Sequence, residues 1–290
     1  MKSEIYVKPF KDYSSTWTFS VLPFHPLTRK NAWALLDSAW KYFCVLQHKQ
    51  KFHITNLPIV YVDHPLDKTI PFVPSNIRIY MDFVNFFCRI IKMFVSRLKK
   101  DGYILSAKIL EFIRKLYIDA AAVYTHSLST TRRPFYLGKP KFFMVHFLDP
   151  HYLCVPSLHV AIVAGLWAKV RELLSETELS DEEKKSILDE IYTGSVAITE
   201  SVLLVKQHSI NCVAGALYML SASNPEGFFK KEDVENFVRR LFENDSYVAE
   251  SDKEKIRNHI ISMYNDLLGK KNSQTEWQKP LHDWLDNYKA

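Results

Sequence analysis

Two histidines and their neighbours are the residues of this sequence best suited to chemistry. His159 follows Pro156 and Ser157 at the start of an apolar run, and His208 follows Lys206 beside a second apolar run. Serine is a favoured N-cap, and a helix N-terminus presents free amides and a partial positive charge to an anion. Imidazole exchanges protons near neutral pH. The pattern predicts phosphate chemistry, although the first motif alone also fits a core helix with a buried histidine.

Three short segments follow one another along the chain: Arg133-Pro134, then Pro156-Ser157-Leu158-His159, then Ser201 with His208. In these segments the sequence resembles the type 2 phosphatidic acid phosphatase superfamily, which includes lipid phosphatases, bacterial acid phosphatases and vanadium haloperoxidases. The stretch around Lys206-Gln207-His208 is most similar to its sphingolipid phosphotransferase branch. The resemblance covers residues 120–222, which is less than half of the chain.

The resemblance implies an all-α helical bundle of the phosphatidic acid phosphatase and haloperoxidase type, and a metal-independent phosphoester hydrolase or phosphotransferase. His208 would attack phosphorus to give a phosphohistidine, which divides one difficult displacement into two easier ones. His159 would act first as general acid and then as general base. The scheme requires neither a metal ion nor a cofactor. The groups implied to bind the phosphoryl oxygens are Arg133, Ser157, the amides of Leu158 and His159, and Lys206.

The sequence departs from the superfamily pattern at several positions. Leu158 stands where the pattern has glycine, and Val202 replaces a phosphate-binding arginine whose charge Lys206 would supply. Cys212 replaces the aspartate that orients the nucleophilic histidine, and a thiol is a weak hydrogen-bond partner. Asn211 is the nearest polar substitute, three residues after that histidine and expected on a neighbouring part of the same helix. Asn211 or Cys212 is therefore the expected relay, and it would stabilise an imidazolium less than a carboxylate does.

Two alternatives remain open at this stage. The first is a non-catalytic helical protein that binds a phosphorylated ligand or a membrane lipid. The second is a metal-dependent hydrolase built on His146, Asp149 and His151, together with His159, because such side chains ligate zinc or iron. Against the second, Asp149-Pro150 is also a common turn sequence, and the segment shows no further ligand at a motif spacing.

Composition narrows the classes of partner. The net charge of +6 favours anionic partners, and we expect a small phosphorylated substrate or a lipid phosphate. The chain has only 7 glycines and no glycine-rich phosphate loop, and its aromatic residues do not alternate with a basic tract as in nucleic-acid binders. The 4 cysteines lack metal-type spacing and no secretory signal opens the chain, so we expect a cytoplasmic protein. A cytoplasmic protein bound to the surface of a membrane is also compatible with these features.

The apolar periodicity predicts one helical domain over residues 1–290, with a catalytic core at 77–222. We expect residues 1–76 to wrap this core, with loops or short strands at 1–30 and 50–76, and residues 228–290 to form a helical extension. No apolar run reaches the roughly 20 residues of a membrane span, so a soluble version of the bundle is expected. The stretch 77–100 could lie on a membrane but favours a core helix. The expected helices are 31–49, 77–100, 105–124, 158–168, one beginning at 181, 231–243, 251–270 and 275–288.

Overall fold

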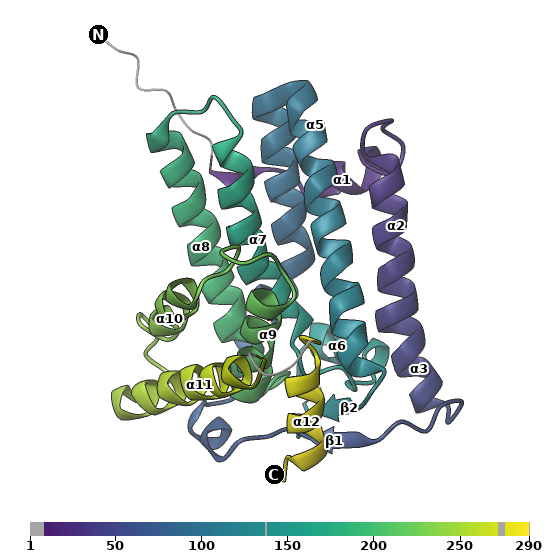
Figure 1. The fold of residues 1–290 in the computed structure, drawn as a ribbon, viewed down its shortest axis with the longest axis vertical. Coiled ribbons are helices and arrows are strands. Elements are labelled where there is room, and N and C mark those ends of the chain that lie inside the picture. The colour runs from purple at the N-terminus through teal and green to yellow at the C-terminus, as the bar shows by residue number, and fades with distance from the viewer. Residues whose placement is uncertain (1–8, 137, 272–275, 290) are drawn as a thin grey trace.

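The computed structural model describes residues 9–136, 138–271 and 276–289, and most of them are helical (Figure 1). The prediction of an all-α fold is confirmed. Within the described residues, strand structure is limited to β1 (Ile59–Tyr61) and β2 (Leu128–Thr130), which pair in parallel. In the same part of the chain, none of the helices combines the length and the apolarity that a membrane crossing requires.

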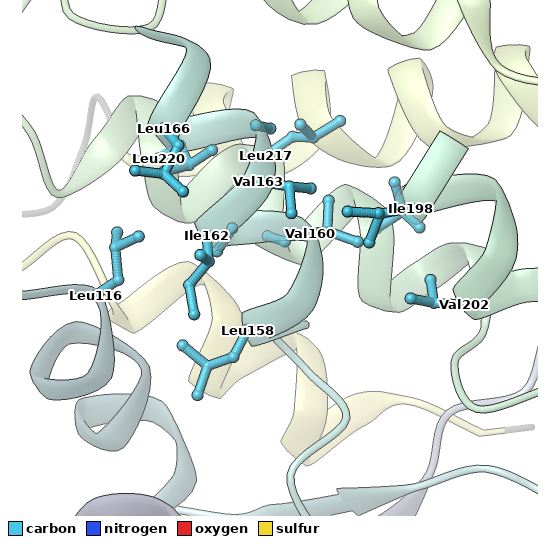
Figure 2. Packing of buried hydrophobic residues seen from close by; sticks show 14 of the residues in the cluster. Leu116, Leu158, Val160, Ile162, Val163, Leu166, Ile198, Val202, Leu217 and Leu220 are labelled. Carbon is cyan, nitrogen blue, oxygen red and sulfur yellow. The ribbon is translucent and has the colours of Figure 1, made fainter. Parts of the chain in front are cut away.

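The centre of the molecule is α7 (Leu158–Ser175), which contacts α5 (Phe83–Tyr124), α8 (Asp181–Leu204) and α9 (Ile210–Ala222). Figure 2 shows the aliphatic side chains of α7 packed against those of α8 and α9. A helix that is apolar on all sides is stable only when neighbours cover it on all sides. Nearly all of α9 and the first half of α7 meet this condition, whereas the second half of α7 carries the charged residues Lys169, Arg171 and Glu172.

The two helices expected at 77–100 and 105–124 are present as α4 (Ile77–Tyr80) and the two arms of α5. Lys99, with a φ of 51°, separates the arms, which lie side by side in Figure 1. The backbone of Gly102 lies so close to the Phe94 carbonyl that a Cβ atom would sit 2.3 Å from its oxygen. Phe86, Ile90 and Phe94 are buried, so the interpretation of this stretch as a core helix is confirmed.

The N-terminal segment differs in part from the prediction. The helix expected at 31–49 is present as α2 (Arg29–Ala39), a π-helical turn (Trp40–Val45) and α3 (Leu46–Lys51). Residues 1–8 lie outside the described residues, but the expectation of loops or strands up to residue 30 is wrong at α1 (Thr16–Val21). Residues 52–76 follow the prediction, with β1 and 3₁₀ turns at Pro65–Thr69 and Pro74–Asn76.

The C-terminal extension contains α10 (Lys231–Arg240), α11 (Glu250–Lys271) and α12 (Lys279–Asn287), close to the expected helices. The sequence did not indicate α6 (Pro140–Leu148). One cluster of buried side chains runs from Phe10 to Leu285, so the wrapping segment and the extension share the core of the bundle. The division into core, wrapping segment and extension stays a prediction.

Candidate active site

His159 is fixed by the start of α7. The Ser157 hydroxyl accepts a hydrogen bond from the Val160 amide at 3.4 Å, so Ser157 is an N-cap as its sequence position predicts. The His159 ring lies against Tyr80, with ring centroids 4.7 Å apart, and against Phe83 at 4.3 Å. Burial in these apolar surroundings, and then the nearby His208 ring, lower the pKa of His159 to about 3. His159 is therefore neutral at neutral pH.

His208 lies in the loop between α8 and α9, so it is not part of a helix. The helix ends at Leu204, Lys206 has a φ of 56°, and the next helix begins after Ser209. The amide of His208 donates to the Val202 carbonyl at 3.2 Å, which fixes the loop against the end of α8. The His208 side chain is 8 % exposed, and its Nδ1 is buried with no hydrogen-bond partner among the described residues.

The structure brings the two predicted catalytic histidines together. The ring centroids of His159 and His208 are 5.5 Å apart, at an interplanar angle of 62°. They share a narrow inner cavity that leaves about 10 Å³ for the centre of a water molecule. A single water needs roughly 10–15 Å³ by this measure, so the inner cavity does not hold a phosphoryl group in this state. Its other walls are Phe43, Gln47, Asp149, His151, Leu153 and Leu158.

His208 also lines an outer groove of about 360 Å³. Four cationic side chains and two carboxylates line this groove, so its charge favours anions. The carboxylates are already engaged by backbone amides: Asp63 accepts from Arg132 at 3.0 Å, and Asp67 accepts from Ile210 at 3.0 Å. The complete lining is Asp63, His64, Asp67, Lys68, Phe72, Thr131, Arg132, Arg133, Pro134, Lys206 and His208.

Arg133 belongs to the outer groove. Its guanidinium donates to Gln207 Oε1 at 3.1 Å and to the Asp149 carbonyl at 3.3 Å. Arg133 and His208 line the groove, whereas His159 and His208 line the inner cavity, so His208 connects the two spaces.

Lys206 has a structural role that the sequence did not indicate. Its ammonium donates to the main-chain carbonyls of Asp67 and Ile70, and burial lowers its pKa. It therefore ties the 3₁₀ turn at Pro65–Thr69 to the loop that carries His208. Lys206 still lines the groove, but its hydrogen bonds to the protein compete with any bond to a phosphate.

The predicted relay residues do not reach His208 in the structure. The Asn211 amide donates to the Val62 carbonyl at 3.1 Å and to Tyr288 Oη at 3.0 Å, and its Oδ1 lies 2.7 Å from His259 Nε2. Cys212 Sγ accepts a hydrogen bond from the Ser209 amide at 3.3 Å. The expectation that Asn211 shares a helix face with His208 is wrong, because the helix begins only after Ser209.

Asp149, His151 and Cys154 complete the site, and the sequence suggested the first two only as metal ligands. His151 Nε2 lies 2.7 Å from Thr131 Oγ1 and 3.5 Å from Cys154 Sγ, and its ring centroid is 6.4 Å from that of His208. Burial acts to lower the pKa of His151, but Cys154 and Asp149 outweigh it and raise the pKa to about 9. His151 is therefore protonated at neutral pH and is paired there with the Asp149 carboxylate, whose pKa the hydrogen bond and charge of His151 lower against the effect of burial.

The metal-dependent alternative has no geometric support. Among residues 9–136, 138–271 and 276–289, no group of three or more His, Cys, Asp or Glu side chains is arranged to hold a metal ion. His146 lies on α6 with its ring edge toward Phe142, at a centroid distance of 6.0 Å, and its Nε2 is buried without a partner in the described chain.

No protein-family model, curated protein or solved structure matches this chain. A functional assignment must therefore rest on the residues of the site and on their arrangement.

Proposed function

We propose that this protein is a metal-independent phosphoester hydrolase or phosphotransferase, built on a bundle of the phosphatidic acid phosphatase type, in which His208 carries the phosphoryl group. The observation that supports this most strongly is the position of His208. It lies against His159 at 5.5 Å on one side and faces a cationic groove on the other.

The groove is where a phosphate would bind first, because the inner cavity is too small. Arg133 would exchange its bond to Gln207 for a bidentate contact with the phosphate, which suits its planar geometry. His208 Nδ1 is enclosed by protein, so Nε2 is the nitrogen left to attack phosphorus. The P–N bond forms as the P–O bond to the leaving group breaks, and the charge on the equatorial oxygens is balanced by the groove cations.

The low pKa of His159 assigns its role within this scheme. A neutral imidazole can accept a proton from the water or alcohol that attacks the phosphohistidine, but a pKa of about 3 makes it a weak base, so this second displacement should be slow. Protonation of the first leaving group requires a proton that the free protein does not hold on His159. A phosphomonoester monoanion brings that proton itself, since the second phosphate pKa is about 6. The best substrate form is therefore the monoanion, and activity should rise as the pH falls toward 6.

A second candidate function, binding of a phosphorylated ligand without turnover, is favoured by one observation. His208 Nδ1 has no described hydrogen-bond partner, so no carboxylate holds this nitrogen when the ring becomes an imidazolium on phosphorylation. In either case the proposed setting is the cytoplasm, because the cysteines are free and suit a reducing compartment.

The test is release of phosphate from p-nitrophenyl phosphate by purified protein in EDTA. We expect turnover that vanadate inhibits, and loss of about a thousandfold in kcat for His208→Ala. The matched control is His25→Ala, because His25 stacks on Tyr103 at 3.7 Å in a different part of the molecule. Vanadate or phosphate binding that requires His208 without any turnover would favour the binding function. Activity that survives His208→Ala would refute both.

A further inference from the structure

An exposed row of apolar side chains lies beside the outer groove. It is formed by Phe135, Phe143, Met144 and Phe147, and is called the aromatic ridge below. These side chains are 86 %, 59 %, 42 % and 67 % exposed, respectively. Figure 1 shows α6, which carries three of them, at the end of the bundle where β1 and β2 lie. Grouped apolar exposure of this kind marks an interaction surface more often than scattered exposure does.

The aromatic ridge is held in place from behind. Phe142, on the other face of α6, is 1 % exposed and packs edge-on against Phe72 and Tyr136, with ring centroids 5.6 and 5.2 Å away. The Phe143 and Phe147 rings lie parallel, 6.1 Å apart, as expected for residues one turn apart. The burial of Phe142 fixes the orientation of α6, so Phe143 and Phe147 on its other face point to solvent. Phe72, which contacts Phe142, also lines the outer groove.

The segments that carry the aromatic ridge bear charge of one sign. Residues 132–136 and 138–147 contain four basic side chains and no aspartate or glutamate. Arg132 and Lys141 are exposed, and Lys139 is half-buried. Aromatic side chains on a helix flanked by lysine and arginine suit the interface of an anionic bilayer, where the rings enter the acyl boundary and the cations meet the headgroups.

We propose that the aromatic ridge docks this protein on the surface of an anionic lipid bilayer, with α6 in the plane of the interface. The charge pattern selects this partner, because an apolar face that pairs with a second copy would bring these same basic residues together and repel it. Docking in this way would place the mouth of the outer groove close to the headgroups. The proposal concerns binding alone, so it stands or falls independently of phosphohistidine chemistry.

The experiment is co-sedimentation of the full chain with vesicles of phosphatidylcholine alone and of phosphatidylcholine mixed with phosphatidylserine. We expect binding to the mixed vesicles, weakened by high salt, and at least a tenfold loss for the double variant Phe143→Ser, Phe147→Ser. The control pair is Phe24→Ser, Trp33→Ser, which removes two aromatic side chains that are 71 % and 57 % exposed near the junction of α1 and α2. A second variant, Lys139→Glu with Lys141→Glu, should lose the preference for phosphatidylserine.

The results of these experiments distinguish a lipid bilayer from a second copy of the chain as the partner of the aromatic ridge. The exposed positions of Phe143 and Phe147 mean that the double variant should keep the melting temperature of the parent protein. Absence of vesicle binding by the parent protein overturns the proposal, and so does equal loss in the control pair. A dimer by sedimentation velocity that dissociates in the Phe143→Ser, Phe147→Ser variant, without vesicle binding, would assign the aromatic ridge to a second copy instead.

Discussion

Replacement of His159 by phenylalanine should make the protein less sensitive to acid. The His159 ring lies between Tyr80 and Phe83, so a phenyl ring of similar size should be accepted at a cost of less than about 1.5 kcal/mol at neutral pH. The difference between the two proteins appears on acidification, because only histidine can take up a proton there.

The magnitude follows from the pKa. His159 has a pKa of about 3 in the folded protein and an ordinary value of 6.5 when unfolded. Between these values the unfolded chain binds a proton that the folded protein does not, so stability falls as the pH falls. At about pH 5 this one group removes about 2 kcal/mol from the free energy of unfolding. This destabilisation by His159 is absent above pH 6.5, its pKa in the unfolded chain, and complete near pH 3, its pKa in the folded protein.

The assay is urea unfolding of the parent protein and of His159→Phe at neutral pH and at about pH 5, with the free energies compared at each pH. The parent should lose about 2 kcal/mol more than the variant over this interval. Other groups also titrate, but they are common to both proteins and cancel in the difference. Parallel loss in the two proteins would show that the pKa of His159 is not depressed, and would remove the assignment of His159 as a neutral base.

Three further predictions address the rest of the site. His151→Gln should lower the free energy of unfolding by about 1–3 kcal/mol at pH values below 6.5, the pKa of histidine in the unfolded chain. This loss should shrink as the pH rises through about 9, because His151 with its raised pKa stabilises the fold only while its ring is protonated. Urea unfolding across this pH range measures the difference. Lys206→Met should lower stability by about 2 kcal/mol, seen as a lower melting temperature, since two carbonyls lose their donor, and an unchanged melting temperature would contradict this role. Cys212→Asp should destabilise by several kcal/mol without raising phosphatase activity, because the position is 0 % exposed; a stable, more active variant would restore the predicted relay.

The sequence was informative where local physics decides the structure. The N-cap at Ser157 is a local property and appears as predicted, whereas α7 continues to Ser175, seven residues beyond the expected end of the helix at 168. The sequence did not indicate α6 because that stretch is apolar without a clear helical period, although Pro140 at its first position is a helix-start signal. The exposed rings that support the membrane proposal lie in this unpredicted helix.

The loop that carries His208 shows a different limit. Its backbone turns at Lys206 with a positive φ, which non-glycine residues adopt rarely, so the apolar residues on both sides read as one helix. The partners of Asn211 could not be predicted either. His259 and Tyr288 come from the C-terminal extension, and no short-range pattern connects them to the motif.

Two independent observations agree on how the His208 ring is held. The sequence has Cys212 where the superfamily pattern has an aspartate, and the structure leaves the buried Nδ1 of His208 without a described partner. The ring is positioned by contact with His159, by its interaction with the Cys154 side chain and by the backbone bond from the His208 amide to Val202. Packing fixes the direction of an imidazole but does not stabilise its cationic form. The proposed chemistry should consequently be slower than in an enzyme that keeps the carboxylate.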